Sequence, residues 1–388
     1  MTEKPSASPV LQGGVSPEVA VSPACHPGSA APSWDSGLVS GDNQAAGMAR
    51  DREVLRVPQG MGHGASDGAA RVSPPRGGSG NHPQQALACP GIPALQGRED
   101  VKTVHYRYAT VCGRRLFYRE AGPAGAPVVV LLHGFPASSF MFRDLIPRLA
   151  DRYHVVAPDH LGFGLSDAPP ASEFAYTFDA LAGLTADLLG QLGITRYAMY
   201  VQDYGAPVGW RLALADPDAI TAVITQNGNG YEAGFVDDFW KPVREFWQDR
   251  NPQTEAGVRQ ALTLEAIQWQ YLHGVPDESL VSPDTWLHDF AQVSRPGNDL
   301  VQLALFADYA TNLQLYPKLH AWLRDSRVPL LAVWGRNDPI FGPQGALAFA
   351  DHAPGAEIHL VEGGHFLLES NLDTVEGYIR GFLGRTLS

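Results

Sequence analysis

Short runs of β-branched and aromatic residues alternate with amphipathic stretches from about residue 101 to the end of the 388-residue chain. The runs have the length and composition of strands, and the stretches between them have the apolar spacing of helices. The run from Val128 to Leu132 is continuously apolar, which is typical of a strand covered on both faces. This alternation predicts an α/β fold in which helices flank a mostly parallel sheet.

Eight strands and several helices can be placed on this pattern. The expected strands are residues 104–111, 114–122, 128–132, 153–159, 196–202, 219–226, 328–335 and 356–362. Helices are expected over 140–151, 177–193 and 371–383. Ser138 or Ser139 is expected to cap the first of these helices, and Gly193 to close the second.

One region interrupts the alternation. From about residue 228 to residue 319 the chain is rich in Trp and Tyr, and its segments read as helices without intervening strands. We expect this region to be a helical cap inserted into a single α/β domain that spans residues 101–388.

Residues 1–100 have a different composition. They are rich in Pro, Gly, Ser and Ala and show neither helical nor strand periodicity. Such a segment cannot bury enough apolar surface to offset its chain entropy, so we expect a disordered tail. A docking or regulatory tail is one alternative. Another is a downstream start, for example at Met48 or Met61, and mass spectrometry of the native amino terminus would distinguish these readings.

Charge restricts the partners of the chain. Its formal net charge of -13 argues against nucleic acid and against anionic membrane surfaces, since both select for clustered Lys and Arg. The sequence has no apolar run of roughly 18 to 20 residues and its start, MTEKPSASPV, has no signal-peptide pattern. We therefore expect a cytoplasmic protein that acts on a small molecule, with its oligomeric state left open.

Asp203 is the first candidate for chemistry. It lies in the segment Val201-Gln202-Asp203-Tyr204-Gly205, where an expected strand meets an expected helix. A sharp turn at such a junction projects one side chain above the sheet and needs a small residue close behind it, here Gly205. The plain alternative is that Asp203 only caps the helix that follows.

Two further residues favour a catalytic role for Asp203. Asp338 follows the expected strand 328–335, and His365 follows the expected strand 356–362. The carboxyl ends of parallel strands meet at one edge of a sheet, so the three side chains are expected to lie together. The order of nucleophile, acid and histidine is the order in which hydrolases of this architecture carry these groups.

The segment His133-Gly134-Phe135-Pro136 follows the apolar strand 128–132. In this architecture the loop in that place supplies half of an oxyanion hole. We expect the donors to be the backbone N–H groups of Phe135 and Tyr204, while a tight turn fixed by Pro136 is the structural alternative.

These motifs, HGFP, VQDYG, NDP and GGHF, resemble those of the α/β-hydrolase superfamily, in its epoxide hydrolase and haloalkane dehalogenase branch. The resemblance covers residue 104 to the end and implies the α/β-hydrolase fold with an eight-stranded sheet. It implies that Asp203 is the nucleophile, His365 the base and Asp338 the carboxylate that orients the base. Asn227 occupies the place where some relatives keep that carboxylate, but it cannot be an anion.

An aspartate nucleophile predicts a covalent alkyl ester, which water activated by His365 would then hydrolyse without any cofactor or metal. Serine would give an ether that the histidine could not hydrolyse. Epoxides and alkyl halides are therefore the candidate substrates. An epoxide oxygen needs a proton donor when it leaves, whereas a halide needs only weak donors such as an indole N–H or an amide.

The cap has features of both substrate classes. The segment from Phe306 to Asn312 resembles an epoxide hydrolase segment, which makes Tyr309 the candidate acid. Trp269 or Tyr271 stands where that family has a second cap tyrosine, and both are expected in the substrate pocket. Epoxide hydrolysis is the leading prediction and haloalkane dehalogenation the alternative. A ligand-binding member of the fold without activity is a further alternative.

Overall fold

The computed structural model describes residues 102–387. The predictions for the tail, residues 1–100, lie outside the described residues. Within the described part, no helix is long and apolar enough to cross a membrane.

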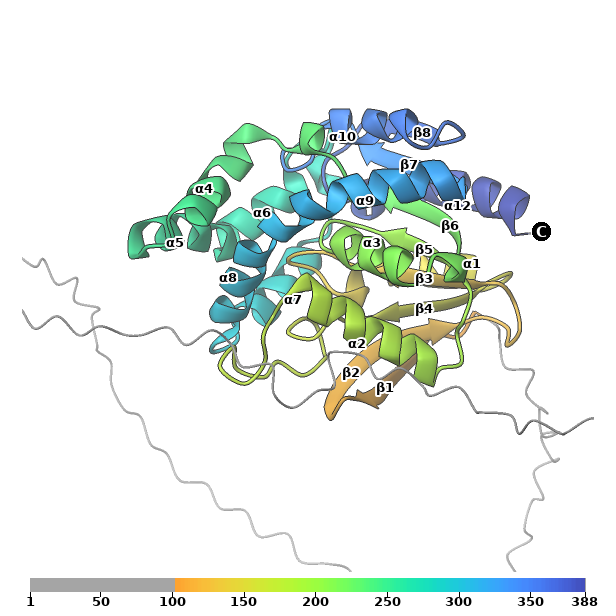
Figure 1. Cartoon of the computed structure of the whole chain (residues 1–388), viewed down its shortest axis with the longest axis horizontal. Coiled ribbons are helices and arrows are strands. Elements are labelled where there is room, and N and C mark those ends of the chain that lie inside the picture. The colour runs from red at the N-terminus through yellow and green to blue at the C-terminus, as the bar shows by residue number, and fades with distance from the viewer. Residues whose placement is uncertain (1–101, 388) are drawn as a thin grey trace, which may run out of the picture. The chain divides into compact units, whose positions relative to one another are not determined.

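A single eight-stranded sheet forms the centre of the domain (Figure 1). Its strands are β1 (His105–Val111), β2 (Arg114–Ala121), β3 (Val128–Leu132), β4 (His154–Pro158), β5 (Tyr197–Val201), β6 (Ile220–Gln226), β7 (Leu330–Gly335) and β8 (Glu357–Val361). They lie in the order β1-β2-β4-β3-β5-β6-β7-β8. β2 runs antiparallel to both of its neighbours, and the other neighbouring pairs are parallel. All eight strands lie where the sequence predicts them.

Burial explains why the central strands read as continuous apolar runs. Every residue of β5 and of β7 is buried, and only Val128 of β3 is partly exposed. Strands covered on both faces have no polar face, so the alternation typical of half-exposed strands is absent.

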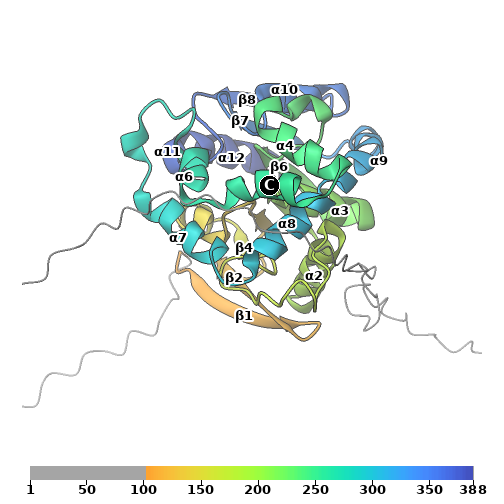
Figure 2. The ribbon, with the colours of Figure 1, turned by 90° about the vertical axis from the view of Figure 1, so that its left-hand side faces the viewer.

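Helices cover both faces of the sheet. The helices outside the cap are α1 (Ile146–Leu149), α2 (Phe178–Gln191), α3 (Gly205–Ala215), α9 (Ala310–Ser326), α10 (Pro343–Leu347), α11 (Leu367–Ser370) and α12 (Leu372–Thr386). α2, α3 and α9 lie side by side on one face, and α11 and α12 lie on the other (Figure 2). This arrangement is the α/β-hydrolase fold that the sequence predicts.

Five helices gather at the carboxyl ends of the strands, on the left of Figure 1, and form the cap. They are α4 (Asp237–Gln248), α5 (Pro252–Arg259), α6 (Leu264–Leu272), α7 (Pro283–Val293) and α8 (Asn298–Asp308). The predicted insertion, about residues 228–319, contains all five, but its predicted end falls inside α9, which packs against α3.

The helix predicted over residues 140–151 is not continuous. A 3-10 turn, Ser139–Phe142, is capped by the Ser138 side chain, and the separate short helix α1 follows it. Pro147 lies in the first turn of α1, where the missing N–H of proline costs nothing, so it marks a helix start and not a helix interior. The helix predicted over 177–193 forms as α2, with Thr177 as its cap and Gly193 at positive φ.

Candidate active site

Asp203 lies on the sharp turn between β5 and α3. Its backbone has φ 46°, a left-handed conformation that is unusual for a residue with a side chain. Gly205 allows the turn, because a Cβ there would lie 2.1 Å from the carbonyl oxygen of Leu132 on β3. The strained turn presents the Asp203 carboxylate at the end of the sheet, which a helix cap alone would not require.

Two backbone N–H groups hold one oxygen of this carboxylate. Phe135 N–H and Tyr204 N–H donate to Asp203 Oδ1 at 2.7 and 2.6 Å. These are the two donors expected from the sequence, and here they bind the aspartate itself. The other oxygen, Oδ2, faces His365, with its Nε2 3.8 Å away.

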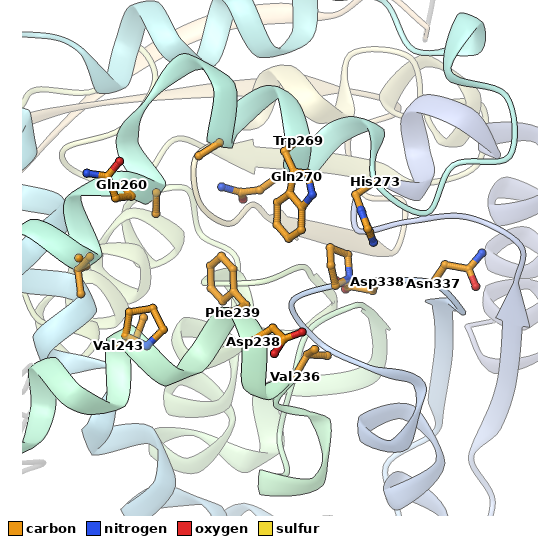
Figure 3. A pocket seen from close by; sticks show the side chains of 16 residues that line it. Val236, Asp238, Phe239, Val243, Gln260, Trp269, Gln270, His273, Asn337 and Asp338 are labelled. Carbon is orange, nitrogen blue, oxygen red and sulfur yellow. The ribbon is translucent and has the colours of Figure 1, made fainter.

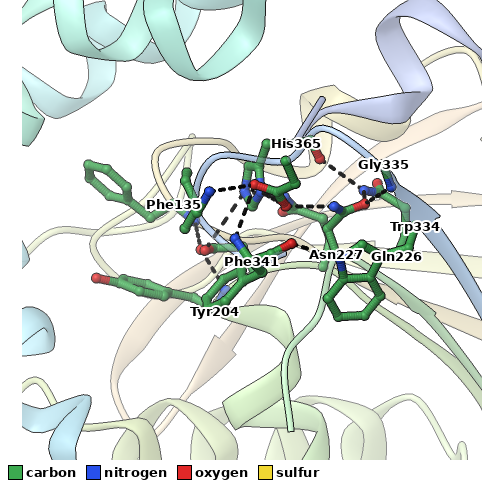
Figure 4. Close-up of polar contacts among 12 residues, drawn as sticks. Phe135, Tyr204, Gln226, Asn227, Trp334, Gly335, Phe341 and His365 are labelled. Atoms are coloured by element: carbon green, nitrogen blue, oxygen red, sulfur yellow. Dashed lines mark hydrogen bonds and ion pairs between the residues drawn. The ribbon is translucent and has the colours of Figure 1, made fainter. Parts of the chain in front are cut away.

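His365 and Asp338 form a buried pair. His365 Nδ1 donates to Asp338 Oδ2 at 2.8 Å, and neither side chain is accessible to solvent. Asp338 is held in turn by the N–H groups of Ile340 and Phe341 on its Oδ1 and by the Asn227 amide on its Oδ2, at 2.5 Å (Figure 4). Asn227 therefore binds the carboxylate that orients the histidine.

Burial and charge set the protonation of Asp203 and His365. Burial raises the pKa of Asp203 to about 6, although the charge of His365 and the two N–H donors act to lower it. Burial also lowers the pKa of His365, but the charge of Asp338, its hydrogen bond and the charge of Asp203 together raise that pKa above its ordinary value. Both pKa values are therefore raised, and Asp203 and His365 compete for a proton that enters the site.

Gln202 is a site residue that the sequence reasoning missed. Its side-chain amide is fully buried and donates to His365 Nε2 at 2.8 Å. Because Nδ1 carries the proton that binds Asp338, Nε2 of neutral His365 is free to accept this hydrogen bond. This hydrogen bond occupies the lone pair of Nε2, so Gln202 has to release Nε2 before that nitrogen can act as a base. Sequence alone presented it only as the last residue of a strand.

Aromatic rings enclose the space above Asp203. Tyr204 lies within ring-contact distance of Phe135, Phe306 and Tyr309, and Tyr309 also contacts Trp240 of α4 at 4.7 Å between ring centroids. Among the described residues, the hydroxyl group of Tyr204 has no hydrogen-bond partner, whereas the hydroxyl of Tyr309 interacts with that of Tyr316. Burial raises the pKa of Tyr309 well above its ordinary value, and Tyr316 and the charge of Asp203 add to this shift. The hydroxyl of Tyr309 therefore keeps its proton at neutral pH.

The two other predicted cap residues have different positions. Trp269 lines a cavity under the cap, as expected, and is 38% exposed. Tyr271 does not line that cavity. Its hydroxyl donates to Asp289 Oδ2 at 2.5 Å, and its ring stacks on Phe366. The packing of α6 turns Tyr271 toward α7, and its role in the substrate pocket stays a prediction.

The comparisons with known proteins agree with this geometry. The family described as the alpha/beta hydrolase fold matches residues 127–372. An uncharacterized hydrolase of Saccharomyces cerevisiae is 43% identical over 263 residues, which are 67% of this chain and 90% of the yeast protein.

Two shorter matches indicate the branch, and one solved structure shares the fold. Epoxide hydrolase A of Mycobacterium tuberculosis is 45% identical over 112 residues, 29% of this chain and 34% of that protein. Haloalkane dehalogenase 2 of the same species is 39% identical over 113 residues, 29% of this chain and 38% of that protein. The structure of haloalkane dehalogenase DbeA from Bradyrhizobium elkani, 24% identical, shares the fold with a TM-score of 0.62 over 73% of this chain and 99% of that chain.

The chain therefore belongs to the α/β-hydrolase superfamily, in the branch that contains epoxide hydrolases and haloalkane dehalogenases. It is a hydrolase. The alternative of a ligand-binding member without activity is accordingly set aside.

Proposed function

We propose that this enzyme hydrolyses epoxides through a covalent ester on Asp203. The observation that carries the proposal is the asymmetric environment of the Asp203 carboxylate. Two N–H groups bind Oδ1, whereas Oδ2 faces His365. A cytoplasmic location and a small-molecule substrate are predictions that go with this proposal.

In the first step Asp203 Oδ2 attacks a ring carbon of the epoxide, and the bond from that carbon to the ring oxygen breaks. The product is an alkyl ester, with Oδ1 as its carbonyl oxygen. Burial favours this attack, since a desolvated carboxylate is a stronger nucleophile than a hydrated one. The alkoxide that leaves takes a proton from a nearby acid.

In the second step His365 removes a proton from water through Nε2, and the resulting hydroxide attacks the ester carbonyl carbon. Negative charge develops on Oδ1, where the N–H groups of Phe135 and Tyr204 are already directed. The bond from the carbonyl carbon to Oδ2 then breaks, and Oδ2 leaves as a hydroxyl of the diol with the proton from His365. Asp203 keeps the oxygen from water, and its proton returns to the acid that was used in the first step. Asp338 stabilises the charged histidine between these events.

The nature of the leaving group follows from the donors of the cap. The hydroxyl of Tyr309 is buried beside Tyr204, and it interacts with another tyrosine hydroxyl, that of Tyr316. The indole N–H groups of Trp240 and Trp247, both close to Tyr309, instead donate to backbone carbonyl groups at 2.9 and 2.7 Å. A buried tyrosine that keeps its proton, beside two indoles that already donate elsewhere, favours protonation of an alkoxide over binding of a halide.

Haloalkane dehalogenation is the second candidate, supported by the relative of that name and by Trp269 on the cavity wall. The purified enzyme should convert styrene oxide to its diol and release little bromide from 1-bromobutane. Release of bromide without formation of diol would reverse this order.

Replacing Tyr309 by phenylalanine should slow epoxide opening by roughly 100-fold, since general acid catalysis contributes factors of about 10² to 10⁴. Single-turnover measurements of diol formation would test this. Tyr176→Phe is the control, because Tyr176 is also buried but its hydroxyl donates to the carbonyl of Pro169. If Tyr309→Phe and Tyr176→Phe behave alike, Tyr309 has no part in the reaction.

The pH dependence should show one acidic limb. Attack requires ionised Asp203, whose pKa is raised to about 6, so kcat/KM should fall as the pH falls through that value. Ester hydrolysis requires neutral His365, whose pKa is raised. Protonation of His365 should therefore also lower the rate of ester hydrolysis as the pH falls. Steady-state rates between pH 4.5 and 9 would check this expectation. A profile that is flat down to pH 4.5 would contradict it.

A further inference from the structure

A cavity of about 630 Å³ lies under the cap, beside the catalytic residues and not directly above Asp203. It is bounded by α4, α5, α6 and the loop after β7, and Figure 3 shows the side chains that line it. Most of the wall is apolar, with Phe239 and Val243 from α4, Val258 from α5 and Trp269 from α6. Asp338 lies at its edge, so the cavity adjoins the active site.

Gln270 is a buried polar residue in this mostly apolar wall. It is 1% exposed, and in the described part of the chain neither its amide nitrogen nor its amide oxygen has a hydrogen-bond partner. Figure 3 shows its side chain extending from α6 among the residues that line the cavity. A buried amide with both ends unpaired is costly and rare in native proteins. Its position therefore points to a ligand that pairs with both ends.

The position of Gln270 is fixed relative to the catalytic loops. A Cβ at Gly364, next to His365, would lie 2.1 Å from the carbonyl oxygen of His273 at the end of α6. A Cβ at Gly274 would lie 2.4 Å from the carbonyl oxygen of Asn337, next to Asp338. These close backbone contacts join α6 to both loops, so a group bound by Gln270 is held at a set distance from the reacting carboxylate.

Charge disfavours an anionic ligand. Among the residues that line the cavity there is no lysine or arginine, while Asp238 and Asp338 are acidic. An anionic group here would be desolvated without a cation to compensate. A carboxamide is neutral and offers one N–H donor and one carbonyl acceptor, which match the carbonyl and the amide of Gln270.

We propose that this cavity binds the part of the substrate that does not react, and that Gln270 selects substrates with a neutral carboxamide on an apolar chain. This inference rests on the proposed epoxide hydrolysis, but only for the identity of the group that reacts. The substrate class is then a medium-sized epoxide whose chain ends in an amide.

Three matched terminal epoxides test the selection, with equal chain length and with a carboxamide, a methyl group or a carboxylate at the far end. The wild-type enzyme should prefer the amide to the methyl compound by roughly 10- to 100-fold in kcat/KM and should reject the carboxylate. Gln270→Leu should abolish the preference for the amide over the methyl compound. The same preference in both enzymes would overturn the proposal.

Gln260→Leu is the control, because Gln260 lines the same cavity but is exposed. It should keep the amide preference. The melting temperature of Gln270→Leu should not fall, since the substitution removes an unpaired buried amide. A clear fall together with loss of all activity would assign Gln270 a structural role and would also overturn the proposal.

Calorimetric titration with hexanamide, which cannot react, separates this inference from the proposed function. Suppose that hexanamide binds to the wild type and to Asp203→Asn but not to Gln270→Leu, and that the enzyme opens no epoxide. This result would support the proposed role of the cavity and refute the proposed epoxide hydrolysis. Epoxide turnover with equal hexanamide binding by wild type and Gln270→Leu would refute the cavity alone.

Discussion

Replacing Asp203 by asparagine should lower epoxide turnover by roughly 10⁴- to 10⁶-fold, the range seen when a nucleophile is removed from a triad. The fold should survive, because the amide oxygen of asparagine can still accept the N–H groups of Phe135 and Tyr204. The amide cannot displace an epoxide oxygen at a useful rate. Single-turnover diol formation would measure the loss.

The control is Asp218→Asn, an exposed aspartate on the turn before β6, which should keep full activity. A stronger test of the route is one turnover in oxygen-18 water. If the ester forms, the label enters the carboxylate of Asp203 and the diol receives an unlabelled oxygen from the aspartate. Label in the diol, with none in the Asp203 peptide, would mean that water attacks the substrate directly.

The relation among Asp203, Asp338 and His365 could be predicted because it follows from topology. Each residue comes directly after a strand, and β5, β6, β7 and β8 run parallel, so their carboxyl ends share one edge. A side chain that follows such a strand therefore lies at this edge of the sheet. The predicted backbone donors, at Phe135 and Tyr204, follow from the same edge and do not depend on side-chain identity.

The cap residues could not be predicted in the same way. Trp269, Gln270 and Tyr271 are consecutive on α6, and each step along an α-helix turns the side chain by about 100°. Which of them enters the cavity depends on the rotation of α6, and the contacts of its end with the Gly364 loop help to set that rotation. Sequence reasoning gave weight to the aromatic residues and overlooked Gln270, which supplies the unpaired amide of the cavity.

The site also shows why an aspartate can be a nucleophile here. Its pKa is raised to about 6 mainly by burial, so the carboxylate has lost much of its hydration and yet is ionised at neutral pH. The two N–H groups bind the oxygen that does not attack. They stabilise the ionised form without blocking Oδ2, and they are already in place when charge returns to Oδ1 in the second step.

Replacing His365 by glutamine should separate the two steps. The first step uses Asp203 and an acid, so the ester should still form, whereas its hydrolysis should slow by roughly 10³- to 10⁶-fold without the base. One equivalent of epoxide should then remain bound. Intact-protein mass spectrometry should show an increase equal to the full mass of the epoxide, because ring opening releases no fragment, and digestion should locate it on Asp203.

The pH of this experiment matters. The charge of His365 lowers the pKa of Asp203, so its removal should raise that pKa and leave less carboxylate at neutral pH. Trapping at pH 8.5 keeps the nucleophile ionised, and trapping at pH 6 should be slower.

Asp338→Asn is the matched comparison, because it keeps the histidine but replaces its charged partner, and its ester should accumulate only in part. Turnover by His365→Gln at nearly the wild-type rate would exclude His365 as the base. Absence of both ester and diol at pH 8.5, in a folded protein, would mean that His365 is needed before the ester forms.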